Sequence, residues 1–69
     1  MTLRDQLENL AGEMVGKGIR LEDAQQEFEK HFIVRALAAA DGNLSRAADL
    51  LGIHRNTLSR KVTDYRLQR

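Results

Sequence analysis

The 69-residue chain contains no cysteine, no proline and no tryptophan, and its aromatic residues are two phenylalanines and one tyrosine. Without cysteine, a disulfide framework and a thiolate metal site are excluded. The apolar runs are short and interrupted by charges, so the sequence predicts no membrane span, and the N-terminus lacks the basic-then-apolar layout of a secretion signal. We therefore expect a cytoplasmic protein.

The chain is also too short for a large hydrophobic core. Residues 1–69 form one small domain, which as a monomer would bury roughly 60% of the surface of its unfolded chain. Because disulfides are excluded, a second copy of the chain is the natural source of further stability. Met1 and the lack of a proline-rich or low-complexity linker favour a complete small protein over a fragment of a longer one.

The net charge is only +1, but the charges are unevenly distributed. Residues 1–42 carry five Lys or Arg against eight Asp or Glu, for −3, and residues 43–69 carry six against two, for +4. Positive charge confined to one part of a small domain is typical of a protein that binds nucleic acid through one surface. The C-terminal part is therefore the candidate binding region.

Apolar periodicity and capping residues predict four helices, over residues 3–15, 22–40, 44–51 and 55–65. The first helix, for which Thr2 is a candidate cap, has a single apolar stripe with spacings of 4, 3 and 4 residues. The second helix has a wider apolar surface than one partner helix would cover, and it contains both phenylalanines. Residues 1–40 are therefore predicted to dimerise. The predicted interface residues are Leu3, Leu7, Leu10, Met14, Phe28, Phe32, Ile33 and Leu37. If the rings of Phe28 and Phe32 are buried, truncating either should weaken folding and dimerisation together.

Residues 42–65 form a predicted helix-turn-helix. Asn43 can cap the first of its helices, and Gly52 can adopt the left-handed conformation that a tight turn requires. The small side chains of Ala47 and Ala48 permit a close crossing of the two helices. The inward stripe of the second helix is formed by Leu58, Val62 and Tyr65.

This stretch resembles the DNA-binding module of the Fis family, which also ends the NtrC class of bacterial activators. The resemblance couples the glycine turn to the paired alanines and to an Arg-x-Thr-Leu motif. The residues that carry it are Gly42, Asn43, Arg46, Ala47, Ala48, Leu51, Gly52, Ile53, Arg55, Thr57, Leu58, Arg60, Lys61 and Tyr65.

The resemblance implies an all-α, four-helix, Fis-like domain with a C-terminal helix-turn-helix, dimerising through its first two helices. It also implies sequence-specific binding to the major groove of double-stranded DNA as a homodimer, with bending of the duplex. The function would be that of a transcriptional regulator or a nucleoid-associated protein, located in the cytoplasm at the nucleoid. An alternative is that the chain is the excised DNA-binding domain of a larger NtrC-class activator.

Arg55, at the start of the second helix of the motif, can donate two hydrogen bonds to O6 and N7 of guanine. Its alternatives are a solvated side chain or an ion pair with Asp49 or Asp64. His54 can reach a base edge or a phosphate, or it can cap the helix. The full set of predicted DNA-binding residues is Asn43, Ser45, His54, Arg55, Asn56, Thr57, Ser59, Arg60 and Lys61.

Two other classes of function are weaker interpretations. Glu27 and His31, four residues apart, suggest an acid–base or metal pair, but no third partner accompanies them, and with Arg35 they form a run of i, i+4 charge pairs. We therefore expect no enzyme activity, no metal, no cofactor and no small-molecule substrate. A helical dimerisation or adaptor module that does not bind DNA would leave the basic C-terminal part unexplained. Salt-sensitive binding to a labelled duplex separates this alternative from DNA binding.

Overall fold

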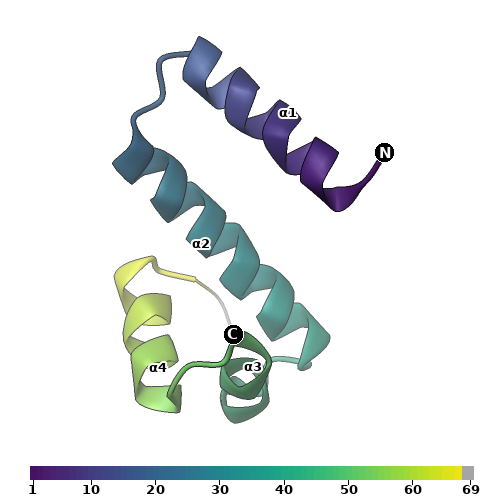
Figure 1. Ribbon diagram of the computed structural model, residues 1–69. Helices are drawn as coiled ribbons and strands as arrows, with labels where there is room; N and C mark the ends of the chain where they lie inside the picture. Colours follow the sequence, from purple (N-terminus) through teal and green to yellow (C-terminus); the bar gives the residue numbers. More distant parts are fainter. Residues whose placement is uncertain (68–69) are drawn as a thin grey trace.

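A computed structural model describes residues 1–67 and contains four α-helices, α1 (Leu3–Gly16), α2 (Leu21–Ala39), α3 (Leu44–Leu51) and α4 (Arg55–Asp64) (Figure 1). All four predicted helices are confirmed, with no boundary shifted by more than one residue. No strand occurs in the part of the chain that the structure describes, so the predicted all-α fold class is confirmed.

The first helix begins with a reciprocal cap. The hydroxyl of Thr2 accepts a hydrogen bond from the backbone N–H of Asp5 at 3.1 Å, and the carboxylate of Asp5 accepts one from the backbone N–H of Thr2 at 3.3 Å. This capping box satisfies two backbone donors that the helix itself leaves unpaired. At the other end the chain reverses through Gly18, which has φ +75°.

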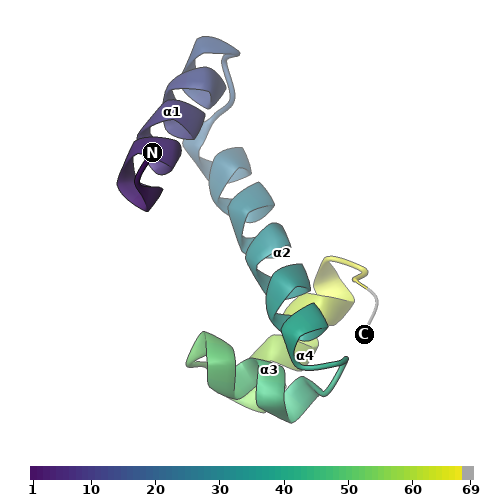
Figure 2. The same cartoon turned by 90° about the vertical axis from the view of Figure 1, so that its right-hand side faces the viewer.

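Helices α1 and α2 form an open V, and α3 and α4 pack against the far end of α2 (Figures 1 and 2). No residue of α1 is buried. The Cα radius of gyration is 13.6 Å, against about 11 Å for a compact domain of this length. The first helix is therefore an arm that projects from the core of the single chain.

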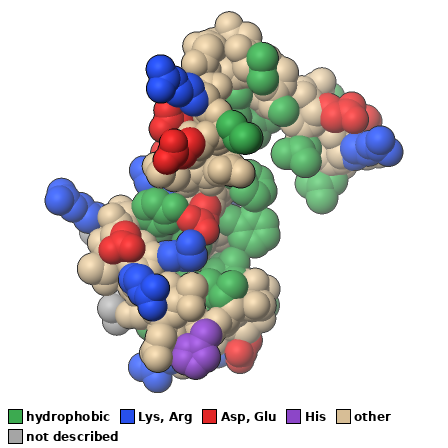
Figure 3. Space-filling view, turned by 60° about the vertical axis from the view of Figure 1, so that its left-hand side comes forward, with side chains coloured by type: hydrophobic (Ala, Val, Ile, Leu, Met, Phe, Trp, Pro, Cys, Tyr) green, Lys and Arg blue, Asp and Glu red, His purple; other side chains and the backbone are tan. Residues whose placement is uncertain are grey.

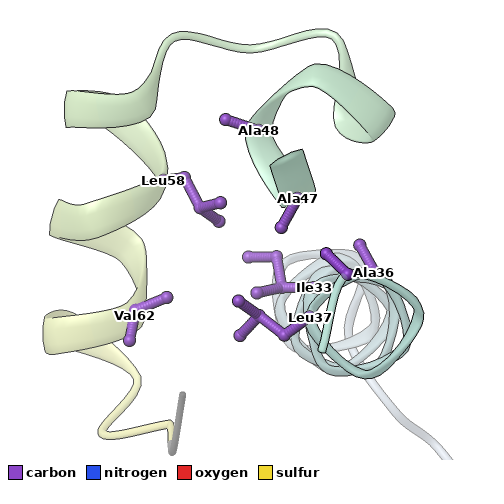
Figure 4. Packing of buried hydrophobic residues seen from close by; sticks show 8 residues of the cluster. Ile33, Ala36, Leu37, Ala47, Ala48, Leu58 and Val62 are labelled. Atoms are coloured by element: carbon purple, nitrogen blue, oxygen red, sulfur yellow. The ribbon is translucent and has the colours of Figure 1, made fainter. Parts of the chain in front are cut away.

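The core lies where α2, α3 and α4 meet. Ile33 and Leu37 of α2 point toward Leu58 and Val62 of α4 (Figure 4). Ala47 of α3 lies between these helices, and together with Ala48 it is almost completely buried. The small side chains at this crossing confirm the prediction that the helices approach closely there. The remaining members of the core are Ala36 and Ala40.

The structure corrects the predicted dimer interface at two positions. The exposed fractions of Ile33 and Leu37 are only 2% and 3%, because α3 and α4 cover this side of α2. Both side chains therefore belong to the core of the single chain and are not available to a second copy. Phe28 and Phe32, on another side of α2, are each 54% exposed.

Candidate nucleic-acid interface

A left-handed glycine sets the angle between α3 and α4. Gly52 has φ +71° and ψ +28°, as predicted, and the backbone N–H of Ile53 donates to the carbonyl of Ala48 at 3.1 Å. A Cβ built on Gly52 would meet no atom within 4 Å. A side chain would have room at this position, so steric crowding does not require a glycine. The left-handed backbone conformation does favour one.

The start of α3 is fixed by Asn43. Its side-chain Oδ1 accepts a hydrogen bond from the backbone N–H of Arg46 at 3.1 Å, which confirms the predicted cap. The link from α2 contains two successive residues with positive φ, Asp41 and Gly42. In the first turn of α3, Ser45 is exposed.

His54 caps the N-terminus of α4. Its Nδ1 accepts a hydrogen bond from the backbone N–H of Asn56 at 3.0 Å. An imidazole nitrogen that accepts carries no proton, so the neutral ring has its proton on Nε2. His54 thus presents a hydrogen-bond donor beside Arg55 at the start of the helix. Of the roles open to His54 from the sequence, the cap is the one that the structure contains.

The outward face of α4 is polar and basic. Leu58 and Val62 point into the core, and Arg55, Asn56 and Arg60 are exposed. Within residues 1–67, the side chain of Arg55 has no ion pair and no hydrogen bond, so the alternative pairs with Asp49 and Asp64 do not form. The remaining predicted residues on the helix, Thr57 and Ser59, are half-buried and border this face.

Lys61 has a partner on α2. Its Nζ is 2.7 Å from Oε1 of Glu29 on α2, and the hydroxyl of Tyr65 donates a hydrogen bond to Oε2 of the same carboxylate. The bonds from Lys61 and Tyr65 lower the pKa of Glu29 below its usual value, and the bond to Glu29 raises the pKa of Tyr65. Lys61 therefore links α4 to α2, and its predicted contact with DNA stays a prediction.

A profile described as "Bacterial regulatory protein, Fis family" matches residues 24–65, which include α3, α4 and most of α2. The chain belongs to the Fis family. No solved structure matches it.

Two kinds of curated relatives share this Fis-family region. The DNA-binding transcriptional regulator NtrC of Bradyrhizobium sp. (strain RP501 Parasponia) is 51% identical over 43 residues, covering 62% of this chain and 9% of the relative. A Fis-like DNA-binding protein of Xylella fastidiosa (strain Temecula1 / ATCC 700964) is 50% identical over 42 residues, covering 61% of this chain and 47% of the relative. The NtrC of Proteus hauseri is 43% identical over 56 residues, covering 78% of this chain and 12% of the relative. The matched region thus spans less than half the length of each of these relatives.

One face of this Fis-family chain shows where basic and hydrophobic side chains gather. Basic side chains gather over the lower part, where α3 and α4 lie, and hydrophobic side chains line the opening beside the projecting arm (Figure 3).

Among residues 1–67 no three His, Cys, Asp or Glu side chains form a group that could hold a metal ion. None of the helices in this range combines the length and apolar character of a membrane span. Glu27 pairs with Lys30 at 3.2 Å, and no i, i+4 pair with His31 forms.

Sequence reasoning missed Glu29, the acceptor for both Lys61 and Tyr65. A signal was present, since Glu29 lies four residues before Ile33 and hence on the side of α2 that faces the core. An acidic residue at the edge of an apolar stripe predicts a cationic or hydroxyl partner on the helix packed against it. The identity of that partner, 32 residues later in the sequence, depends on the tertiary packing.

Proposed function

We propose that this protein binds double-stranded DNA as a homodimer and acts as a transcriptional regulator or a nucleoid-associated protein, alone or as part of a longer chain. The observation that carries the proposal is the exposed polar face of α4, with Arg55 in its first turn and Leu58 and Val62 anchoring the opposite face. The names of the relatives, which describe DNA-binding proteins, are consistent with this function.

In the proposed complex, α4 lies in the major groove. Arg55 donates to O6 and N7 of a guanine, and Asn56 and Arg60 contact neighbouring bases or the backbone. Asn43 and Ser45, at the start of α3, face a phosphate, with the free backbone N–H groups of that helix end as additional donors. His54 offers its Nε2–H to an acceptor atom on a base edge or a phosphate. The exposure of Ser45, Arg55 and Arg60 supports these roles.

The exposed area of the single chain supports dimerisation. Its accessible surface is 5719 Å², whereas a folded monomer of 7.8 kDa exposes about 4400 Å². The excess of about 1300 Å² is larger than the area of about 800 Å² that each partner buries in a standard stable interface. A single chain therefore leaves enough surface open for a second copy.

The open surface is apolar where the helix periodicity of the sequence predicts a partner. We define the dimer surface as the exposed or half-buried apolar residues on α1 and α2, namely Leu3, Leu7, Leu10, Met14, Phe28 and Phe32. A groove of about 400 Å³ runs between the two helices and is lined by several of these residues. The partner's first two helices would fill this groove and cover the aromatic pair. A symmetric dimer of this kind places its two α4 helices toward adjacent major grooves, so the target sites are roughly palindromic. Bending of the duplex between the half-sites belongs to the same proposal, with a cost that depends on the sequence bent.

Selection of bound sequences from a random duplex pool, followed by affinity measurements on the selected site, tests the function. We expect Arg55→Ala to weaken binding to the selected site by about 1–3 kcal/mol and to weaken binding to random duplex much less. Lys17→Ala is a matched control, because it removes the same charge from the turn between α1 and α2, far from the helix-turn-helix (Figure 1). Equal losses of Arg55→Ala on both duplexes would assign the residue to a phosphate. Absence of any complex at low ionic strength would leave a dimerisation module and refute the proposal.

A further inference from the structure

One carboxylate connects α2, which carries part of the proposed dimer surface, to α4, the helix proposed to read DNA. Oε1 of Glu29 accepts a hydrogen bond from Nζ of Lys61 at 2.7 Å, and Oε2 accepts one from the hydroxyl of Tyr65. Among the described residues, these are the only side-chain hydrogen bonds that join one helix to another helix or to its C-terminal cap residue, which for α4 is Tyr65. Glu29 is therefore the single polar tie between α2 and the last turn of α4.

The tie adds a directional restraint to the apolar packing of the core. Leu58 and Val62 hold α4 through apolar contacts, which are non-directional. Hydrogen bonds to a charged group have a preferred geometry, and here two of them reach separate oxygens of one carboxylate from residues one helical turn apart. Nζ of Lys30 also lies 5.7 Å from the ring centroid of Tyr65, a cation–π contact that further restrains the ring.

The tie also lies next to the dimer surface. Glu29 follows Phe28 in the sequence, and Phe28, Phe32, Glu29 and Lys61 line one hollow of about 310 Å³. A change in the angle of α4 at Glu29 would therefore change the position of the reading helix relative to the dimer surface. In a dimer, the same change occurs in both copies and alters the separation of the two reading helices.

We propose that Glu29 is a positioning residue for DNA recognition, which fixes the angle of α4 on α2 through Lys61 and Tyr65 and thereby sets the half-site spacing that the dimer accepts. This inference rests on the proposed homodimeric DNA binding. It goes further by assigning the selectivity for spacing to a residue that lies outside the reading face.

The first experiment measures affinities of the whole chain for duplexes that differ only in the number of base pairs between two selected half-sites. The wild type is expected to prefer one spacing. Glu29→Ala is expected to bind that spacing about tenfold more weakly, the equivalent of one net hydrogen bond to a charged group, while affinity for the other spacings changes much less. A loss of stability alone would lower all affinities by the same factor, so the ratio between spacings isolates the positioning role.

Matched variants sharpen the comparison. Glu22→Ala removes the same charge from the first turn of α2, away from Lys61 and Tyr65, and it should keep the wild-type ratio. Glu29→Gln keeps one acceptor oxygen and should restore part of the preference. Tyr65→Phe removes only one of the two bonds and should give an intermediate ratio, which tests the proposal even if Glu29→Ala does not fold.

A second experiment reports on the tie without DNA. Tyr65 is the only tyrosine and the chain has no tryptophan, so the absorbance of tyrosinate in an alkaline titration reports this residue alone. The charged groups around it are Glu29, Lys30, Lys61 and Asp64. Since the bond to Glu29 raises the pKa of Tyr65, the midpoint should fall in Glu29→Ala and stay unchanged in Glu22→Ala.

The outcomes separate the two proposals. If the wild type binds duplex but Glu29→Ala keeps the wild-type spacing ratio, the positioning role is overturned and the proposed function stands. An unchanged tyrosine midpoint in Glu29→Ala would overturn the tie itself. If the wild type forms no complex with any duplex at low ionic strength, the proposed function fails and the positioning role fails with it, whatever the tyrosine titration gives.

Discussion

Phe28 is a position at which the proposed dimerisation can be tested separately from folding. Its residue surface is 54% exposed in the single chain, and its ring centroid lies 5.5 Å from that of Phe32, which is equally exposed. A phenylalanine side chain has about 200 Å² of surface, so about 110 Å² remains for a partner to cover. At about 25 cal/mol per Å², this area is equivalent to about 2.7 kcal/mol per chain.

Phe28→Ala should therefore weaken the dimer and leave the fold of the single chain largely intact. Alanine keeps only a methyl group, so we expect a loss of about 2 kcal/mol per chain and about 4 kcal/mol in a symmetric dimer, where the residue occurs twice. The dissociation constant would rise roughly a thousandfold. Sedimentation equilibrium over a range of concentrations measures this constant, and circular dichroism reports the helices. The sequence-based expectation of a joint loss of folding and dimerisation was conditional on buried rings, and in the single chain both rings are about half exposed.

Val34→Ala provides the control. Val34 is also on α2 and 45% exposed, but it lines none of the grooves that Phe28 lines. Its truncation should leave the dissociation constant within a small factor of the wild-type value. A wild-type chain that sediments as a monomer at every concentration, or a Phe28→Ala chain that associates as tightly as the wild type, would refute this reasoning.

Three further predictions concern stability. Leu58→Ala removes a side chain with no exposed surface and should lower the free energy of unfolding by about 2–5 kcal/mol in urea denaturation; a loss below this range would mean that the core relaxes around the gap. Gly52→Ala should cost about 1–2 kcal/mol in the same assay, from the left-handed backbone alone, and a neutral result would contradict that cause. Bonds from Lys61 and Tyr65 lower the pKa of Glu29 in the folded chain below its ordinary value of 4.5. The stability that these bonds contribute is therefore present above pH 4.5 and is lost as the pH falls through the lowered pKa of the folded chain. In thermal melting at acid pH, Glu29→Gln should lack this loss of stability.

Local features of the fold are readable from the sequence because their causes are local. Asn43 caps α3 through a bond that spans three residues, and Gly52 ends the helix through its own backbone conformation. Both positions were predicted, and the helix boundaries agree to within one residue. The crossing at Ala47 and Ala48 was also predictable, since a close approach of helices requires small side chains.

The partners of α2 were not readable in the same way. Phe28, Phe32, Ile33 and Leu37 belong to one apolar pattern, and periodicity shows that they are apolar without showing which element covers each. Only the placement of α3 and α4 separates Ile33 and Leu37, which are buried within the chain, from the exposed phenylalanines. The pairing of Lys61 with Glu29 was missed for the same reason.

The small size of the core has a consequence for how the protein works. Within residues 1–67, eight residues are buried, and four of them are alanines, which contribute little apolar area. Further burial is available from the apolar groove along α1 and α2, which a partner's helices would cover. Binding of a second copy would then stabilise α2. This helix carries Ile33, Leu37 and Glu29, which form the surface against which α4 packs. Dimerisation and the orientation of the reading helix would therefore be coupled through α2, with no separate linker between them.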